Sequence, residues 1–533
     1  MTASGNAPDP ALAQQIEQGY GLLRQQRFGD AVQFARALAA SSPDSPHVLV
    51  LAAEASLAIG AVDDAVDWTD RAIFASGGNP FLKLKKARLL GQVRRRAQVP
   101  ALAAEISATA GNDGPVLWQL ATLYYRNNLQ PEAIAHFQRA HAVIGDHPGL
   151  LYEMATARFF SGDFEQAERD IERLLRVAGD FGPALYLRAT LRRQTPERNH
   201  LADLEQRIAA GFRNPDDEAA ALYALAKENE DLGRHDASFD ALARGAARRR
   251  GTLANYSLSA ELASMQAIRD AYTRETMATP VSGHDGEGAI FIVGMPRSGT
   301  TLVERSLVQS GRVRSAGELL DFGNLLAAAT QPLVSLAQSQ AQASLGVDFA
   351  ALGAQYMDGA RQAAGGSALF IDKMPVNYLY CGMIARALPG ARIIHLVRDP
   401  LDSCYAVFKT LFFNSYSFSY DLEELADYYI GYRRMMAHWH EVMPGRILDV
   451  HYEELVTDTE AQMRRIYGWC GLEWTADVLE APTDAAIFAT ASAAQVREPV
   501  HSRSVGSAAR HRRRMGPLVD RLTAAGLLAE TAL

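Results

Sequence analysis

The chain has 533 residues, of which 48% are hydrophobic, and it carries a formal net charge of -8 at pH 7. Because domains usually contain roughly 100 to 200 residues, at least two domains are expected. The acidic balance excludes a global basic field that would attract nucleic acid or an anionic membrane, so any anion site must be local.

The cysteine content favours a reducing compartment. Cys381, Cys404 and Cys470 have no paired spacing that would form a metal site or a disulfide framework. The first ten residues lack the basic start and apolar run of a secretion signal. No window approaches about 18 uninterrupted apolar residues, so no membrane span is predicted. We therefore expect a cytoplasmic protein.

Alanines recur at a fixed interval in the first half of the chain. Ala31, Ala65, Ala133 and Ala167 each follow a short loop, and they lie 34, 68 and 34 residues apart. A period of 34 is that of the tetratricopeptide repeat, in which small residues let paired helices approach closely. Residues 8–250 therefore resemble an all-α tetratricopeptide-repeat solenoid of about five to seven helical pairs.

The repeat region is expected to bind a partner, because solenoids present an extended concave surface. An acceptor protein or peptide is the favoured partner, and a simple spacer is the alternative. Residues 251–287 end in a glycine-rich polar run, which is typical of a linker. Residues 288–533 form the second predicted domain.

Short β-rich runs alternate with amphipathic helical stretches in this second domain. The runs are 289–293, 368–371, 391–397 and 446–450. The alternation predicts an α/β domain with a parallel sheet and helices on both faces. Ligands of such sheets gather at the carboxyl ends of the strands, so the residues just after each run are candidates for a site.

The first strand end has the pattern of a phosphate-binding loop that opens a helix. Gly294 and Gly299 match the glycines of G-x-x-x-x-G-K-[ST], but Thr300 replaces the lysine. Backbone N–H groups and hydroxyls at a helix N-terminus bind anions. The pattern therefore predicts a phosphate site and disfavours an ATPase. The loop residues are Pro296, Arg297, Ser298, Gly299, Thr300 and Thr301.

Further polar residues follow the other predicted strands. Lys373 follows the second strand, Arg398 the third and Tyr452 the fourth. The cations Arg297, Lys373 and Arg398 indicate a ligand with several anionic groups. No metal-binding nucleotide motif accompanies them, so the site is expected to work without a metal.

These residues resemble the cofactor loops of sulfotransferases that use 3′-phosphoadenosine 5′-phosphosulfate (PAPS). The likeness rests on 296–301 and on Arg398, Asp399 and Pro400 about a hundred residues later, and it covers about residues 288–510. Within that superfamily the chain is most similar to tyrosylprotein sulfotransferases and to bacterial proteins that fuse tetratricopeptide repeats to such a domain. The resemblance implies a P-loop-like fold, PAPS as cofactor, adenosine 3′,5′-bisphosphate as product and no metal.

The resemblance also implies roles for individual residues. Arg297 and the loop after it would grip the 5′-phosphosulfate, and Arg398 would bind the 3′-phosphate. Glu318, 21 residues after Arg297, corresponds to the catalytic glutamate, and Lys373 corresponds to the catalytic lysine. Arg297 is assigned to catalysis with them. Further cofactor contacts are assigned to Ser403, Tyr452 and Ser492.

Three positions depart from the family pattern. Ala406 stands where a serine usually contacts the 3′-phosphate, with Ser403 and Lys409 as candidate substitutes. Ser507 and Ala508 replace a lysine-tryptophan pair. Two alternatives to an active sulfotransferase therefore stay open: a P-loop kinase, and a repeat scaffold with a degenerate nucleotide-binding domain.

In the expected mechanism, Glu318 takes the proton of an acceptor hydroxyl while Arg297 and Lys373 stabilise charge on oxygen. The acceptor is a protein or peptide tyrosine presented by the repeats, or else a saccharide, lipid or small-molecule hydroxyl. The aromatic segment 408–420 is equally compatible with an acceptor cleft and with ordinary packing. His395, on the third predicted strand, is expected to be a core histidine.

Overall fold

The structure is a computed structural model that describes residues 8–92, 98–127, 129–337, 339–476 and 501–529. Its contacts divide the chain into two compact units, Met1–Ala157 and Arg158–Leu533. The predicted repeat region, 8–250, therefore contributes helices to both units.

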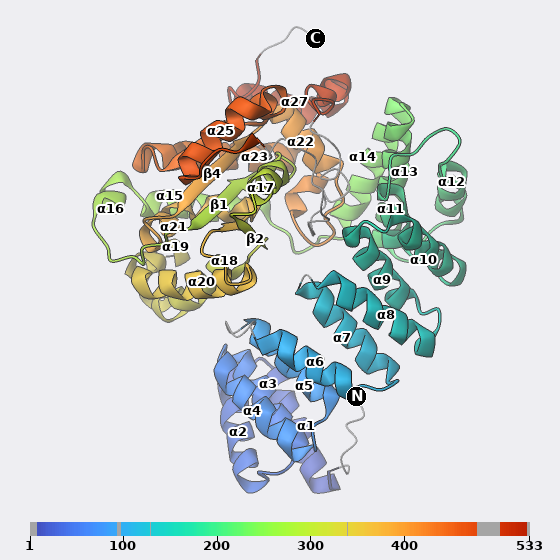
Figure 1. Ribbon diagram of the computed structural model, residues 1–533, viewed down its shortest axis with the longest axis vertical. Coiled ribbons are helices and arrows are strands. Elements are labelled where there is room, and N and C mark those ends of the chain that lie inside the picture. The colour runs from blue at the N-terminus through green and yellow to red at the C-terminus, as the bar shows by residue number, and fades with distance from the viewer. Residues whose placement is uncertain (1–7, 93–97, 128, 338, 477–500, 530–533) are drawn as a thin grey trace. The chain divides into compact units, whose positions relative to one another are not determined.

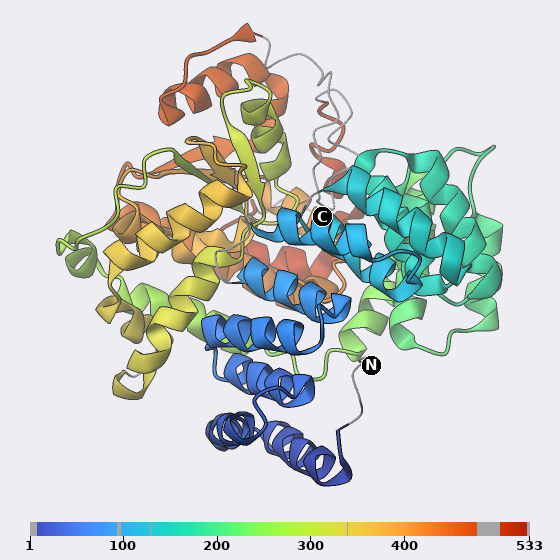
Figure 2. The same ribbon diagram turned by 60° about the horizontal axis from the view of Figure 1, so that its bottom comes forward.

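The described part of the first unit is helical, and its first helices form a stack (Figure 2). The small residues explain the close packing, because Ala31, Ala65 and Ala133 are fully buried. A Cβ added to Gly19 would lie 2.5 Å from Leu51 Cδ2, so a larger residue there would require the Leu51 side chain to move. The helices are α1 (Pro10–Arg24), α2 (Phe28–Ser41), α3 (Pro46–Ala58), α4 (Val62–Ala75), α5 (Pro80–Gln92), α6 (Val99–Thr109), α7 (Gly114–Arg126), α8 (Gln130–Ile144) and most of α9 (Pro148–Ser161).

The second unit begins with more helices of the repeat region. They are α10 (Phe164–Val177), α11 (Gly182–Thr190), α12 (Leu201–Ala210), α13 (Pro215–Asp231) and α14 (His235–Gly251). Residues 251–287, assigned to a linker from composition, contain α15 (Leu258–Ala271) and α16 (Arg274–Ala278). Met265, Ile268 and Tyr272 of this segment are buried.

Five parallel strands form the sheet of the second unit, in the order β2-β3-β1-β4-β5. This sheet after a helical repeat region confirms the predicted fold class. The strand that the sequence did not indicate is β2, which has the residues Arg-Ser-Ala-Gly and no apolar run. The strands are β1 (Ala289–Gly294), β2 (Arg314–Gly317), β3 (Phe370–Asp372), β4 (Arg392–Val397) and β5 (Ile447–His451).

Helices cover both faces of the sheet, as predicted (Figure 1). On one face, Ile292 and Leu396 belong to a buried core with residues of α17 and α25. On the other face, Phe291 stacks on Tyr356 of α20 with ring centroids 5.5 Å apart. The alternation of side chains along β1 thus explains why both faces need a helical layer.

The remaining elements surround the sheet. They are α17 (Thr300–Val308), α18 (Asp321–Thr330), η2 (Gln331–Leu336), α19 (Gln340–Ala343), η3 (Ser344–Gly346), α20 (Phe349–Ala363), η4 (Pro375–Tyr380), α21 (Cys381–Ala387), α22 (Pro400–Phe408), η5 (Ser417–Tyr420), α23 (Leu422–Val442), α24 (Tyr452–Thr457), α25 (Thr459–Cys470), η7 (Ser507–Met515) and α27 (Gly516–Ala524).

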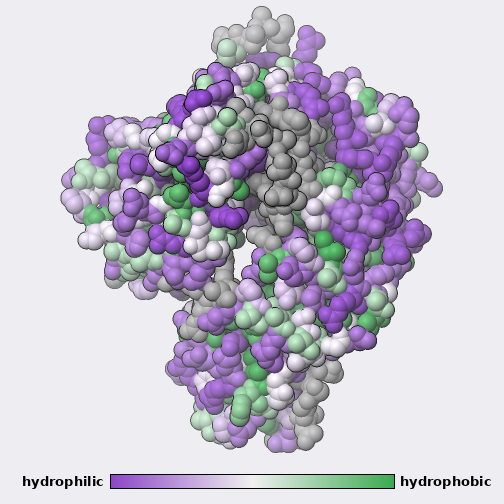
Figure 3. Space-filling view, in the orientation of Figure 1, coloured by the Kyte–Doolittle hydropathy of each residue, from purple (hydrophilic) through white to green (hydrophobic). Residues whose placement is uncertain are grey.

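The face of the molecule drawn in Figure 3 is largely hydrophilic, with hydrophobic residues scattered over it. Among the described residues, no helix combines the length and the apolar composition needed to cross a bilayer.

Candidate active site

The phosphate-binding loop connects β1 to α17, and its backbone has an unusual conformation. Gly294 has φ 149°, Gly299 has φ 104° and Arg297 has φ 66°. Positive φ at a residue as large as arginine is uncommon and is often associated with functional sites. A Cβ on Gly299 would lie 2.6 Å from Tyr452 Cδ2, so glycine lets the turn pack against that ring.

The loop leaves polar atoms available at the start of α17. Ser298 is 1% exposed, and its Oγ has no hydrogen-bond partner among the described residues. Gly299, the N-cap of α17, makes no side-chain cap hydrogen bond. A buried hydroxyl without a partner is costly, and a helix N-terminus attracts anions. These features fit a phosphate group.

Lys373 joins two carboxylates at the carboxyl end of β3. Its Nζ forms an ion pair with Glu318 and lies 3.7 Å from Glu304 Oε2. The lysine is 1% exposed and Glu304 2%, whereas the Glu318 side chain is 37% exposed. The backbone N–H of Lys373 donates to the carbonyl oxygen of Gly317, the last residue of β2, at 3.0 Å. This bond places Lys373 beside Glu318, the next residue in the chain. The pairing of β2 with β3 thus brings together residues 55 positions apart.

Glu304 is a buried residue of this group that the sequence did not single out. It lies on α17, and its Oε1 accepts a hydrogen bond from Ser315 Oγ at 2.5 Å. Burial raises the pKa of Glu304, and the charge of Lys373 opposes that shift. The only local signal was that Glu304 and Arg305 are adjacent charged residues between the apolar residues 302–303 and 307–308.

Asp372, which precedes Lys373, is a fully buried carboxyl. It accepts hydrogen bonds from Tyr356 Oη at 2.6 Å and from Asn377 Nδ2 at 3.2 Å. Burial nevertheless raises the pKa of Asp372 from 3.8 to about 7. The folded protein therefore retains a proton that the unfolded chain releases between these two pH values.

Stability should fall as the pH rises from about 4 to about 7, since the folded state binds the extra proton in that window. Asp372→Asn should remove a slope of up to about 1.4 kcal/mol per pH unit from the unfolding free energy. Urea unfolding at several pH values measures this slope. The exposed Asp358→Asn on α20 is the control and should leave it unchanged. Equal slopes for wild type and Asp372→Asn would contradict the assignment.

Arg398 links the phosphate-binding loop to the C-terminal segment. Its Nη1 donates to Arg297 O at 3.0 Å and its Nη2 donates to Ser504 O at 2.8 Å. The guanidinium lies 4.7 Å from the ring centroid of Tyr452, and Tyr452 Oη bonds Ser504 Oγ at 2.7 Å. Arg398 Nε is buried and has no partner among the described residues. The arginine thus has a fixed position, and its Nε–H is left without an acceptor.

The start of α22 binds the same C-terminal segment. Asp402 accepts hydrogen bonds from the backbone N–H of Gly506 at 2.6 Å and of Ala508 at 2.8 Å. Ser403 is buried on this turn, and its backbone N–H donates to Asp399 O at 2.8 Å. Ser492, the last predicted cofactor contact, lies outside the described residues.

Helices of the repeat region contact α22 and the segment after it. Lys409 Nζ, a candidate phosphate ligand from the sequence, forms an ion pair with Glu230 of α13 at 2.9 Å. Tyr223 Oη donates to Phe408 O at 3.1 Å. The backbone N–H of Leu411 donates to Tyr186 Oη at 3.2 Å. The aromatic segment 408–420 is therefore held by side chains of α11 and α13.

Arg249 of α14 binds the middle of this aromatic segment. Its Nη2 donates to Phe413 O at 2.7 Å and to Asn414 Oδ1 at 3.0 Å. Phe413 and Tyr416 both have positive φ, 54° and 53°. Two such non-glycine residues indicate a backbone shape that its surroundings must stabilise.

The pKa values of two tyrosines in these elements respond to charged residues of the candidate site. Burial raises the pKa of Tyr186, and the positive charge of Arg297 partly counters that shift. Burial also raises the pKa of Tyr416, and the negative charge of Glu318 adds to it. The predicted catalytic residues Arg297 and Glu318 thus act electrostatically on aromatic side chains of the repeat helices and the 408–420 segment.

Two parts of the chain match known families. Residues 289–476 match the sulfotransferase family and residues 16–80 match the tetratricopeptide repeat. The chain therefore combines a sulfotransferase-family domain with tetratricopeptide repeats, which confirms the resemblance inferred from its motifs.

Among curated proteins, an uncharacterized protein of Aquifex aeolicus (strain VF5) is 27% identical over 384 residues, 70% of this chain and 50% of that protein. Protein-tyrosine sulfotransferase 1 of Danio rerio is 26% identical over 227 residues, 39% of this chain and 59% of that protein. The chain thus spans between half and three-fifths of the length of these relatives. Among solved structures, the sulfotransferase domain of the Synechococcus PCC 7002 olefin synthase is 17% identical, with 46% of this chain and 97% of that chain covered and a TM-score of 0.33.

Proposed function

We propose that the chain transfers a sulfuryl group from PAPS to a hydroxyl group of a protein or peptide acceptor. The observation that carries the proposal is the ion pair between Lys373 and the half-exposed Glu318, beside the helix that the phosphate-binding loop opens. Sulfuryl transfer requires a base for the acceptor hydroxyl and cations for the departing phosphate oxygen. In this pair Glu318 is the base and Lys373 is a cation.

The described residues fit the donor. Ser298 Oγ and the N-terminus of α17 would bind its 5′-phosphate, and the free Nε of Arg398 would bind its 3′-phosphate. The Tyr452 ring, packed against Gly299, would contact the adenine. When bound, PAPS supplies the sulfuryl group, and adenosine 3′,5′-bisphosphate is the product that leaves.

The chain's own residues have separate tasks in the proposed reaction. Glu318 accepts the acceptor's hydroxyl proton, so that the oxygen can attack as it loses that proton. Lys373 and Arg297 stabilise the negative charge that develops on the oxygens of the transferred and leaving groups. Glu304, buried behind Lys373, keeps the lysine directed toward this edge of the sheet.

Ser298→Ala tests the phosphate site. Adenosine 3′,5′-bisphosphate at about 100 times its Kd should stabilise the wild type by about 2.7 kcal/mol. The variant should bind it roughly tenfold or more weakly, because a hydrogen bond to a charged group is lost. Its stability without ligand should stay level or rise, since the buried Oγ has no partner to lose.

Thermal unfolding with and without the bisphosphate measures both effects. Ser306→Ala on the same helix is the matched control, because Ser306 Oγ already donates to Leu302 O at 3.0 Å. It should bind the bisphosphate as the wild type does. No thermal shift in the wild type at millimolar ligand would refute a PAPS site, and equal affinity of Ser298→Ala would refute this loop as its phosphate subsite.

A tyrosine in a protein or peptide is the acceptor that we favour. Tetratricopeptide repeats generally mediate protein interactions, and α11 and α13 of the predicted repeat region hold the aromatic segment 408–420. A relative is named a protein-tyrosine sulfotransferase. Incubation with labelled PAPS and a lysate of the source cells identifies the acceptor, and label found only on saccharide, lipid or small molecules would exclude a protein acceptor.

We also propose a cytoplasmic location for the protein. The free thiols of Cys381, Cys404 and Cys470 fit a reducing compartment.

A further inference from the structure

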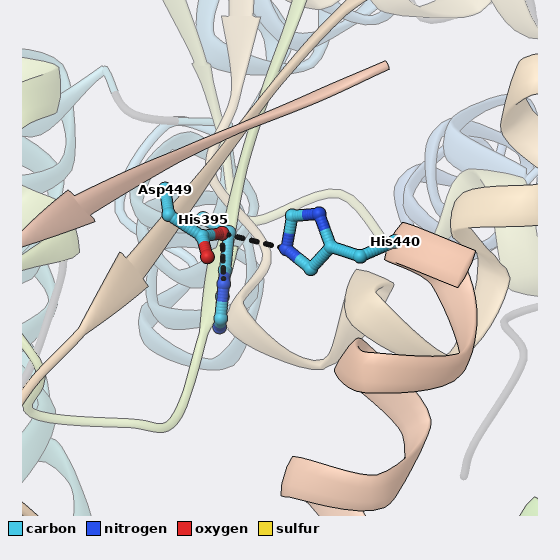
Figure 4. A group of neighbouring side chains, drawn as sticks. All are labelled: His395, His440 and Asp449. Carbon is cyan, nitrogen blue, oxygen red and sulfur yellow. Dashed lines mark hydrogen bonds and ion pairs between the residues drawn. The ribbon is translucent and has the colours of Figure 1, made fainter. Parts of the chain in front are cut away.

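A second group of chemically active side chains lies away from the Glu318–Lys373 pair. His395 of β4, Asp449 of β5 and His440 of α23 each offer one atom to a common centre, and these atoms lie within 4.8 Å of one another (Figure 4). Asp449 Oδ1 lies 2.8 Å from His395 Nδ1 and 2.9 Å from His440 Nε2. His395 precedes His440 by 45 positions and His440 precedes Asp449 by 9, yet both imidazoles contact the same oxygen of Asp449.

The sequence could not indicate this group, because its residues have no short metal-binding spacing. Their approach follows from the fold. β4 and β5 are parallel neighbours in which His395 is in register with Asp449. His440 lies in the last turn of α23, whose Tyr432 contacts His395 of β4. His395 is in the core as predicted, with 2% exposure, but it faces two polar groups there.

Access to the group is one-sided. The side chains of Asp449 and His440 are 37% and 36% exposed, whereas that of His395 is 2% exposed. A cation could therefore enter from solvent at the edge strand β5, and the buried imidazole would form the inner wall. A site with three protein ligands and a remaining open position has the ligand number that zinc uses with water in its fourth place.

The buried imidazole also has the outer partner that metal-ligating histidines usually have. His395 Nε2 is hydrogen-bonded to Tyr432 Oη, and Tyr432 Oη lies 3.5 Å from Leu396 O. With a proton on Nε2 donated to the tyrosine oxygen, Nδ1 presents its lone pair to the centre. In that tautomer the lone pairs of Nδ1 and of the carboxylate face each other at 2.8 Å, which leaves room for a cation between them, whereas in the other tautomer Nδ1–H donates to Asp449 directly.

Such a cation is either a proton, in which case the group is a hydrogen-bond network, or a metal ion held by the three ligand atoms. Arg433 of α23 acts electrostatically on His395, and Tyr429, Arg433 and Cys381 act on the neighbouring Tyr432.

We propose that His395, His440 and Asp449 form a binding site for a divalent transition metal, with zinc as the ion of best fit. Zinc bonds imidazole nitrogen and carboxylate oxygen at about 2.0 to 2.2 Å, which places tetrahedral ligand atoms about 3.3 Å apart. Opening the 2.8 and 2.9 Å contacts by about half an ångström would meet that geometry. The bound ion would join β4, which leads to Arg398, to β5 and α23.

Zinc titration of the chelator-treated full-length chain tests the proposal. One zinc per chain should bind and raise the unfolding temperature. His440→Ala and Asp449→Asn should each weaken binding by at least tenfold, and Tyr432→Phe by about tenfold through the lost outer partner. His451→Ala, an exposed histidine two residues after Asp449, is the control and should keep wild-type affinity.

Two further readouts keep the test decisive if a variant folds poorly. In the wild type, zinc affinity should rise from pH 6 to pH 8, because the ion displaces protons from the imidazoles. Cobalt in place of zinc should give the intense visible absorption of a four-coordinate site. No zinc binding by the wild type, or equal binding by His440→Ala and Asp449→Asn, would show that the group is a proton-bridged hydrogen-bond network only.

Discussion

Glu318→Gln should lower the rate of sulfuryl transfer by about 10²- to 10⁴-fold, the range that a positioned general base contributes. Glutamine keeps the size of the side chain and can still accept a hydrogen bond from Lys373 Nζ, but it cannot take a proton from the acceptor. Binding of adenosine 3′,5′-bisphosphate should therefore persist. The measurement pairs the turnover of labelled PAPS with lysate acceptors and the thermal shift by the bisphosphate.

Glu304→Gln is the matched variant, because both carboxylates face the same lysine. Glu304 is 2% exposed and cannot reach an acceptor, whereas Glu318 is 37% exposed. Glu304→Gln should change the rate by about tenfold or less, through a less firmly directed Lys373. A larger loss in Glu304→Gln than in Glu318→Gln, or retained turnover in Glu318→Gln, would remove Glu318 as the base.

The part of the site carried by local sequence pattern was predictable. The run from β1 through Gly294 and Gly299 into α17 is contiguous, and its glycines adopt the positive φ that such a turn requires. Lys373 and Arg398 follow apolar strands, so the rule that ligands gather at strand ends singled them out before the fold was known. The roles assigned to these residues stay predictions until they are tested.

The part of the site that depends on tertiary contacts could not be predicted. β2 was missed because an edge strand of four residues needs no apolar run, and without it the position of Glu318 rested on spacing alone. Glu304 and Ser504 acquire their partners, Lys373 and Arg398, only in the folded chain. Arg249 was one of three adjacent arginines in a helix, and nothing local distinguished it from its neighbours.

These three arginines show how α14, a helix of the predicted repeat region, contacts the aromatic segment and α23. Arg249 is buried and donates to Phe413 O and to Asn414 Oδ1. Arg250 forms a two-point ion pair with Glu424 of α23. Arg248 pairs with Glu218, and its side chain is 48% exposed. The helix thus anchors the aromatic segment with one arginine, binds α23 with the next and leaves the third at the surface.

Arg249→Ala should lower kcat/KM for the acceptor by about 10- to 100-fold, because a misplacement of about 1 Å near the reacting groups can cost 10² in rate. It should also destabilise the protein by about 2 kcal/mol, since Phe413 O loses a charged donor. Arg248→Ala supplies the control, and an exposed ion pair is worth at most about 1 kcal/mol. Turnover with a fixed acceptor and urea unfolding measure the two effects.

The affinity for adenosine 3′,5′-bisphosphate distinguishes a role of Arg249 in positioning the aromatic segment from a role in stabilising the whole domain. Arg249 contacts the aromatic segment and Asp216, and neither belongs to the phosphate-binding loop. The Kd of Arg249→Ala for adenosine 3′,5′-bisphosphate should therefore stay within about twofold of wild type while acceptor turnover falls, and Arg249→Lys should restore part of it through a single donor. Equal loss of bisphosphate binding and turnover would mean that Arg249 supports the whole domain. Unchanged turnover would mean that the 408–420 segment has no part in acceptor binding and is ordinary packing.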